Sequence, residues 1–157
     1  MHNFITFIAK YLVFALPVVW LMVLGRLPKK QRLQFVLFSA LSAVIAAVLV
    51  KLATHLHQDL RPFVRDHVTP YFQSSTDNGF PSDHTTFSAL VALVVLRYKR
   101  WWGAALFALA ILIGTARVIA GVHHGQDIAG GLVIAAVAVG LVWLIEKAAR
   151  RLRTPKA

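Results

Sequence analysis

Five apolar stretches divide the sequence and constrain the fold more than any other feature. They cover approximately residues 4–24, 33–53, 85–96, 101–116 and 128–145. A helix needs about 20 residues to cross the hydrocarbon core of a bilayer, within a range of about 17 to 25. Three of the stretches are long enough as they stand, and the fourth is long enough if its helix continues beyond it. The sequence therefore predicts an all-α, polytopic membrane helix bundle with about five transmembrane helices.

The third apolar stretch is the shortest of the five. It reaches a sufficient length only if its helix begins near Ser82 and ends near Tyr98. We therefore expect one end of this helix to lie in protein rather than in lipid.

The composition agrees with a membrane protein that consists of a single domain. Hydrophobic residues make up 58% of the chain and charged residues only 15%, against about 25% in an ordinary soluble domain. The absence of cysteine excludes a disulfide scaffold, a thiolate metal site and a cysteine nucleophile. With no repeat and no long linker, we expect a single integral-membrane domain over residues 1–157, with a core at 4–146 and a basic tail at 147–157.

The basic residues alternate from loop to loop and so predict the membrane topology. The formal net charge is +11, which in a soluble chain would suggest nucleic acid, but here 12 of the 17 basic residues lie in three alternate regions. These are Arg26, Lys29, Lys30, Arg32; Arg97, Lys99, Arg100; and Lys147, Arg150, Arg151, Arg153, Lys156. The positive-inside rule places such regions in the cytoplasm. We therefore expect a multi-pass protein of a bacterial inner membrane with an external N-terminus, a cytoplasmic C-terminus and no nucleic-acid partner.

All the aspartates and histidines fall on the predicted outer side, where polar residues form three clusters at helix ends. The clusters are Arg61-Pro62, then Pro81-Ser82-Asp83-His84, then Arg117 with His123, His124 and Asp127. Because all three lie at one membrane face, a bundle of this size can bring them into a single site.

The chemistry of these clusters favours an anionic ligand. Ser82 suits the N-cap of a helix, and the unpaired N–H groups of a helix start attract anions. His123 and Asp127 are four residues apart, so they share one face if the last helix begins early. The carboxylate could then hold one ring nitrogen of His123 and leave the other free as a nucleophile.

This three-part pattern resembles the signature of the type-2 phosphatidic acid phosphatase superfamily, which includes lipid phosphate phosphatases and vanadium haloperoxidases. The run Phe80-Pro81-Ser82-Asp83-His84-Thr85-Thr86 and the small five-helix body are similar to the bacterial undecaprenyl pyrophosphate phosphatases of the bacitracin-resistance type. The resemblance covers about residues 4–145. The membrane-like composition disfavours a soluble haloperoxidase.

The resemblance implies a metal-independent phosphatase without a cofactor. In it, His123 would attack phosphorus to form a phosphohistidine, Asp127 would orient His123, and His84 would protonate the leaving oxygen. Three side chains would bind the phosphoryl oxygens: Arg61, Ser82 and Arg117.

Three positions depart from the family pattern. Thr54 stands where the family usually has a lysine, and either Lys51, about one turn earlier, takes its place or no residue does. Asp83 stands at a position that is often glycine, and Ala116 at one that is often serine.

Several other outer polar residues have a simple structural interpretation. We expect Asp59, Asp66 and Asp77 to be solvated loop charges or turn formers. Isolated outer histidines are interpreted as interfacial residues, whereas a role for His124 stays open.

Three classes of function are compatible with these residues. The first is an outward-facing phosphatase for undecaprenyl pyrophosphate, and phosphatidylglycerophosphate or phosphatidic acid remain alternative lipid substrates. The second is a non-enzymatic transporter or assembly subunit, which predicts polar residues at several membrane depths. The third is a metal-dependent hydrolase, although the sequence contains no HExxH-type metal motif. The sequence does not indicate an oligomeric state.

Overall fold

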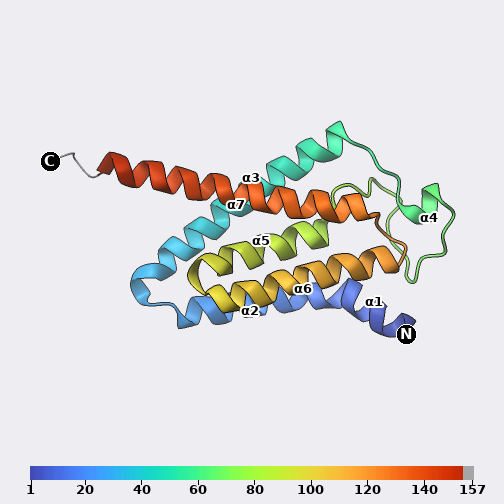
Figure 1. The fold of residues 1–157 in the computed structure, drawn as a ribbon, viewed down its shortest axis with the longest axis horizontal. Coiled ribbons are helices and arrows are strands. Elements are labelled where there is room, and N and C mark those ends of the chain that lie inside the picture. The colour runs from blue at the N-terminus through green and yellow to red at the C-terminus, as the bar shows by residue number, and fades with distance from the viewer. Residues whose placement is uncertain (154–157) are drawn as a thin grey trace.

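The protein is a bundle of long helices joined at both ends by short turns and at one end by a long loop (Figure 1). The computed structural model describes residues 1–153, and within that range it contains no β-strand. The last four residues of the predicted basic tail, including Lys156, lie outside the described residues. The elements are α1 (His2–Tyr11), the 3₁₀ helix η1 (Leu12–Phe14), α2 (Ala15–Arg26), α3 (Lys29–Leu56), α4 (Pro62–Arg65), α5 (Asp83–Tyr98), α6 (Arg100–Ile119) and α7 (Gly125–Arg153).

Four helical segments are long and apolar enough to cross a membrane, which confirms the predicted membrane bundle. They are His2–Arg26, Lys29–Leu56, Arg100–Ile119 and Gly125–Leu152. The fifth long helix, α5, has 16 residues and is shorter than the others. It packs mainly on α6 and α7 and also on α2 and α3, so much of its surface faces protein rather than lipid.

The first span is bent in the half that contains the N-terminus. The α-helix tightens into the 3₁₀ helix η1 just before Pro17 and then continues as α2. Proline has no N–H to donate to the carbonyl four residues earlier, and its ring crowds that carbonyl. The local tightening before Pro17 follows from these two effects.

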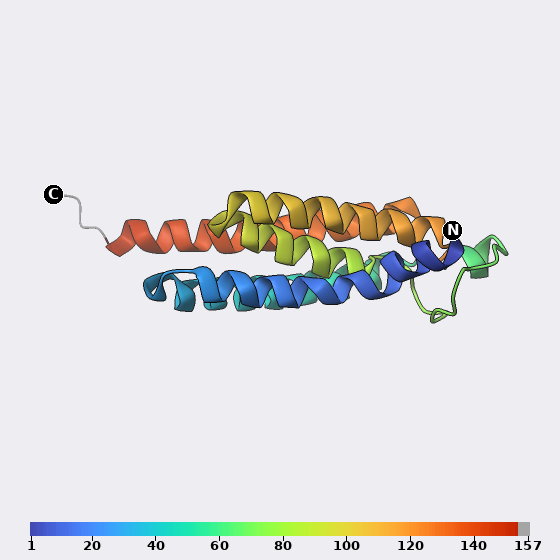
Figure 2. The ribbon, with the colours of Figure 1, turned by 90° about the horizontal axis from the view of Figure 1, so that it is seen from below.

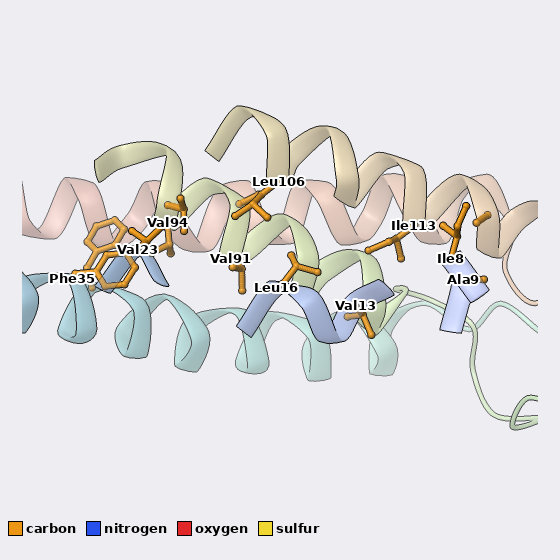
Figure 3. Close-up of a cluster of buried hydrophobic side chains, with 14 of the residues drawn as sticks. Ile8, Ala9, Val13, Leu16, Val23, Phe35, Val91, Val94, Leu106 and Ile113 are labelled. Atoms are coloured by element: carbon orange, nitrogen blue, oxygen red, sulfur yellow. The ribbon is translucent and has the colours of Figure 1, made fainter. Parts of the chain in front are cut away.

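Apolar side chains from several helices meet along the length of α5 (Figure 3). Leu16 of α2, Phe35 of α3, Val94 of α5 and Ile113 of α6 are all buried in this core. Glycine allows α7 to approach α5 closely, since a Cβ on Gly131 of α7 would lie 2.8 Å from Thr86 Oγ1. The core therefore holds α5 in register with α6 and α7.

The two ends of the bundle differ in character. One end carries the α2–α3 and α5–α6 turns, and there Glu146 accepts a hydrogen bond from Gln34 and pairs with Arg97. The other end carries the N-terminus of the chain, residues 57–82, the start of α5 and the α6–α7 turn (Figures 1 and 2). All three polar clusters found in the sequence lie at this second end.

Candidate active site

One asparagine, Asn78, holds the loop between α3 and α5 by hydrogen bonds to the backbone. The Asn78 side-chain oxygen accepts hydrogen bonds from the backbone N–H groups of Asp59 (2.9 Å) and Phe80 (3.0 Å). Its amide nitrogen donates to the carbonyls of Thr54 and His57. The two ends of the loop are thereby held together, which places Arg61 near the start of α5.

Ser82 occupies the N-cap of α5, as predicted, and is completely buried. Its backbone N–H donates to the Asp127 carbonyl at 3.1 Å, and its hydroxyl oxygen accepts from Thr85 Oγ1 at 3.2 Å. The starts of α5 and α7 are therefore docked against one another.

His123 and Asp127 form the pair that their spacing predicted. Helix α7 begins at Gly125, early enough to place Asp127 in its first turn, and the distance from His123 Nδ1 to Asp127 Oδ2 is 3.1 Å. The backbone N–H of His124 also donates to this oxygen at 2.8 Å. The carboxylate is thus fixed from two sides, and it fixes the imidazole in turn.

Two buried arginines face the other nitrogen of His123. Arg61 Nη1 and Arg117 Nη2 each lie 3.2 Å from His123 Nε2, and both side chains are at least nine-tenths buried. An arginine can only donate and a carboxylate only accept. The network therefore assigns the proton of a neutral His123 to Nδ1, facing Asp127, and leaves the Nε2 lone pair directed at the two guanidinium groups.

The surroundings of His123 favour its neutral form. Burial is the main cause of a lowered pKa for this ring, and the charges of Arg117 and Arg61 act in the same direction, whereas Asp127 opposes them. A neutral imidazole with a free lone pair between two fixed cations can attack an electrophile that carries negative oxygens.

His84 is half-buried at the start of α5. It lies close enough to Arg117, His123 and Arg61 to interact electrostatically with all three. It also lines a cavity with Val13, Phe14, Pro17, Asp83 and Phe87. The structure therefore brings together the six predicted residues Arg61, Ser82, His84, Arg117, His123 and Asp127.

Lys51 is the predicted residue that the structure does not bring to this site. Its side chain is exposed on α3, and within the described chain no hydrogen bond or ion pair joins it to a site residue. Thr54 instead donates its hydroxyl to the Phe80 carbonyl at 3.2 Å, so it supports the loop. Asp83 is exposed, as expected if this extra carboxylate turns away from an anion.

The expectation that Asp59 is a solvated loop charge is wrong. Asp59 is 5% exposed and accepts hydrogen bonds from Arg65 (2.9 Å), His124 Nδ1 (2.8 Å) and Gln126 (2.6 Å). Burial alone would raise its pKa, but the hydrogen bonds from Gln126 and His124 outweigh burial and lower it. His124, whose role was left open, therefore links α7 to the loop, and its Nε2 also lies 3.0 Å from Asp66 Oδ2.

Asp77 is exposed, as expected of a loop residue, but it is also a direct partner of Arg61. Its Oδ1 accepts from Arg61 Nη2 (2.9 Å) and Nε (3.2 Å) and from Ser75 Oγ (2.6 Å). The hydrogen bond from Ser75 and the Arg61 guanidinium lower the pKa of Asp77. Sequence reasoning missed this contact because the sequence does not show that the loop folds back over Arg61.

The first span also contributes to the site through its backbone. Arg117 Nη1 donates to the Ala9 carbonyl at 2.9 Å, one turn before the bend at η1. A charged arginine in an otherwise apolar helix is costly in a membrane. The hydrogen bond gives Arg117 a partner more than 100 residues away in the sequence.

Asp127 of the site and two of its neighbours lie close enough together to be considered as metal ligands. Ligand atoms of Asp59, His124 and Asp127 lie within 4.8 Å of one another. However, Arg65, Gln126 and His124 already supply hydrogen bonds to Asp59, so we assign this cluster a structural role.

Comparison with known proteins agrees with the geometry. The family model described as the PAP2 superfamily, the phosphatidic acid phosphatases of type 2, matches residues 33–151. The chain belongs to the PAP2 superfamily.

Relatives of this PAP2 protein carry names that refer to undecaprenyl diphosphate. It is 28% identical over 137 residues to the undecaprenyl-diphosphatase BcrC of Bacillus subtilis (strain 168), covering 87% of this chain and 70% of that protein. It is 34% identical over 145 residues to the putative undecaprenyl-diphosphatase YbjG of Escherichia coli (strain K12), covering 87% of this chain and 71% of that protein. The predicted family and its bacitracin-resistance branch are thus confirmed.

Solved structures of membrane phosphatases share the fold. LpxE of Aquifex aeolicus superposes with a TM-score of 0.71 at 26% identity, covering 90% of this chain and 84% of that one. A PAP2-type phosphatidylglycerolphosphate phosphatase of Bacillus subtilis gives a TM-score of 0.63 at 21% identity, covering 97% and 79%. Together with the family match, this fold identifies the PAP2 protein as a membrane lipid phosphatase, a hydrolase with a lipid substrate.

Proposed function

We propose that this PAP2 protein hydrolyses undecaprenyl pyrophosphate to undecaprenyl phosphate and inorganic phosphate. The observation that carries the proposal is the arrangement at His123, where one ring nitrogen faces Asp127 and the other faces two arginines. The names of its relatives support the choice of lipid.

The first step transfers the terminal phosphoryl group to His123. The Nε2 lone pair attacks the terminal phosphorus, the bond from phosphorus to the bridging oxygen breaks, and His84 gives its proton to that oxygen as undecaprenyl phosphate leaves. Arg61 and Arg117 donate to the phosphoryl oxygens in place of their contacts with Nε2, and Ser82 completes the cradle. Fixed donors of this kind stabilise the charge that builds up in the transition state.

The second step releases inorganic phosphate. His84, now neutral, takes a proton from a water molecule that attacks the phosphorus of the phosphohistidine, and the bond from phosphorus to Nε2 breaks. Asp127 holds the Nδ1 proton throughout, so that His123 keeps one orientation. In this scheme, Lys51 has no part and no metal ion is needed.

The proposed topology puts this chemistry at the outer face of a bacterial plasma membrane. The basic residues gather at the opposite end of the bundle, which the positive-inside rule assigns to the cytoplasm. A site at one end of the bundle lies at headgroup level, so a lipid can present its pyrophosphate while its tail stays in the bilayer. All of residues 1–157 are proposed to form one domain.

The test is phosphate release by the purified protein from a panel of lipid phosphates and pyrophosphates. We expect undecaprenyl pyrophosphate to be preferred, with activity unchanged by EDTA and abolished in His123→Ala. His55→Ala, at an exposed position on α3, is the matched control and should retain activity. A preference for phosphatidylglycerophosphate or phosphatidic acid would overturn the substrate, and an active His123→Ala would overturn the mechanism.

A further inference from the structure

Asp59 holds the turn between α6 and α7 through side chains that lie between the site residues in the sequence. Its Oδ2 accepts hydrogen bonds from His124 Nδ1 (2.8 Å) and Gln126 Nε2 (2.6 Å). His124 directly follows His123, and Gln126 directly precedes Asp127. One buried carboxylate therefore holds the short segment that carries the proposed nucleophile and the carboxylate that orients it.

The backbone of Asp59 is fixed in the loop that carries Arg61. Its N–H donates to Asn78 Oδ1 at 2.9 Å, and its carbonyl accepts from the Gly79 N–H at 2.8 Å. The loop lies directly against the site, since a Cβ on Gly79 would be 3.1 Å from both the Asp59 carbonyl oxygen and Asp127 Oδ2. Asp59 thus links the segment of a proposed phosphate-binding arginine to the turn of the proposed nucleophile.

The Asp127 side chain is hydrogen-bonded only from within its own turn. Its Oδ2 accepts from the His123 ring and from the His124 N–H. Its Oδ1 is buried and has no hydrogen-bond partner among the described residues. These contacts fix the carboxylate relative to His123, but they do not fix either side chain relative to Arg61.

Two further contacts join this turn to the rest of the site through its backbone. Arg61 Nη1 donates to the Val122 carbonyl at 3.2 Å, and the Ser82 N–H donates to the Asp127 carbonyl at 3.1 Å. Neither contact involves the Asp59 side chain, so we expect the turn to keep its fold when that side chain is removed. The Asp59 side chain then contributes the finer placement of the His123 ring.

We propose that Asp59 is a positioning residue for phosphoryl transfer. By holding His124 and Gln126, it fixes the approach of the His123 ring to the bound phosphorus. This inference rests on the proposed function, because it uses the role of His123. Reacting atoms must be aligned about 3–3.5 Å apart, and a misplacement of about 1 Å can lower the rate about 100-fold. Loss of the Asp59 contacts therefore slows the chemical step and leaves the arginines free to bind phosphate.

The experiment removes the Asp59 contacts separately. Gln126→Ala removes a contact to the turn, Arg65→Ala removes a contact to α4 outside the turn, and Asp59→Ala removes all of them. We expect kcat to fall about ten-fold or more in Asp59→Ala and about three-fold or more in Gln126→Ala. Arg65→Ala is the control and should keep kcat within about two-fold of the wild type, because Arg65 is half-exposed and exposed ion pairs contribute little.

Inhibition by inorganic phosphate shows whether the arginines still bind their ligand. It should stay within about two-fold of the wild type in Asp59→Ala and Gln126→Ala, because both arginines remain. An unchanged kcat in Asp59→Ala overturns the inference, as do equal falls in Gln126→Ala and Arg65→Ala. A loss of phosphate inhibition as large as the loss of kcat also overturns it, since Asp59 would then act on binding.

The pH profile separates positioning from a loss of folded protein. The hydrogen bond and the charge of Asp127 raise the pKa of His123, so a loosened pair lowers this pKa and moves the acid limb of kcat/KM to lower pH. A loss of folded enzyme lowers the rate without moving the limb. Gln126→Ala removes no charge, and an acid limb that stays in place in this variant overturns the inference. Gln126→Ala also decides the question if Asp59→Ala does not fold.

A measurement that needs no turnover separates this inference from the proposed function. In protein with isotope-labelled histidine, NMR detects the Nδ1 proton between His123 and Asp127, and its absence in His123→Ala assigns it. We expect this resonance to move upfield in Gln126→Ala but not in Arg65→Ala, and an unchanged resonance in Gln126→Ala overturns the inference. An active His123→Ala would refute the proposed mechanism, and another preferred lipid would refute the proposed substrate, whatever the NMR result.

Discussion

The charged groups of the site lie close to the two nitrogens of the His123 ring. Two guanidinium groups face one nitrogen and a carboxylate faces the other, in surroundings from which most water is excluded. Because burial and the arginines lower the pKa of His123, the proposed nucleophile stays neutral at a pH where a solvated histidine, with a pKa of about 6.5, would be half protonated.

The first residue-scale prediction concerns the pH profile of kcat/KM. His123 must be neutral, so activity falls as the pH drops through its pKa, and we expect this acid limb below about pH 6.5. Loss of protonated His84 gives the alkaline limb, and the profile is bell-shaped. The measurement is phosphate release between about pH 4 and 9. Flat activity over this range would contradict the assignment.

Arg61→Gln is the matched variant for this profile. It removes one positive neighbour of His123 and so raises the pKa of the ring, which moves the acid limb to higher pH at a lower rate. The substrate ionises in the same way with both proteins, so its ionisation does not contribute to the difference between their pH profiles. A limb that stays in place or moves to lower pH would show that His123 is not the group that titrates.

The second residue-scale prediction concerns Asp77. Its carboxylate occupies the Nε and Nη2 donors of Arg61 and neutralises part of the charge that a phosphate would meet. Asp77→Asn keeps a hydrogen-bond acceptor but removes the charge, so inorganic phosphate should inhibit about three- to ten-fold more strongly. The effect is modest because Asp77 is 68% exposed and well screened.

The measurement for Asp77 is competitive inhibition by phosphate at low and high salt, with Ser75→Ala as the control. Ser75→Ala removes the hydrogen bond to Asp77 but no charge, and it should have the smaller effect. Weaker phosphate inhibition in Asp77→Asn would show that this carboxylate positions Arg61 for the substrate.

At the scale of elements, α5 determines where the proposed phosphate-binding residues lie. It is short, its N-cap is Ser82, and it is enclosed by α6, α7, α2 and α3. Contact between the starts of α5 and α7 sets the distance between Ser82 and the pair formed by His123 and Asp127. Stability and activity therefore depend on the same contact.

Gly131→Ala tests this contact. A Cβ at Gly131 would lie 2.8 Å from Thr86 Oγ1 and 3.1 Å from the Ser82 carbonyl, which forces α7 away from α5. We expect a loss of about 1–3 kcal/mol in stability, typical of overpacking, together with lower kcat. Thermal unfolding in detergent and phosphate release measure the two effects.

Gly140→Ala on the same helix is the control for Gly131→Ala. A Cβ at Gly140 would meet no heavy atom within 4 Å, and alanine favours the helix by up to about 1 kcal/mol. It should be neutral or stabilising. Equal effects of the two substitutions would show that the α5–α7 contact does not limit stability.

At the scale of the whole molecule, the candidate active site and most of the basic residues lie at opposite ends of the bundle. The long loop, the start of α5 and the α6–α7 turn, which carry the site residues, lie at one end of the bundle (Figure 1), and most basic residues lie toward the other. The Arg26 guanidinium lies over the Trp102 ring, and the Lys147 ammonium lies over the Trp143 ring. Such pairs are expected of side chains at a membrane–water interface.

The absence of cysteine allows a direct test of orientation. Gln73→Cys in the long loop and Lys30→Cys in the first turn of α3 introduce single exposed thiols. In intact spheroplasts, a membrane-impermeant maleimide should label Gln73→Cys, and Lys30→Cys should react only after lysis. The reverse pattern would place the site in the cytoplasm.

The sequence by itself determined the features that depend on local pattern. The apolar stretches predicted the helices, because a bilayer requires about 20 apolar residues per span. The helix start at Ser82 and the pairing of His123 with Asp127 also followed from local rules of capping and helical spacing. The family motifs grouped the six residues that the structure brings together.

Only the tertiary structure decided which distant groups meet. The burial of Asp59, the contact of Asp77 with Arg61 and the Ala9 carbonyl on Arg117 depend on the path of the long loop and on the bend in the first span. Periodicity and capping describe interactions within a few residues, whereas these contacts join segments up to 108 positions apart. Hydrophobic packing around α5 brings those segments together, and this packing cannot be predicted from the spacing of residues along the chain.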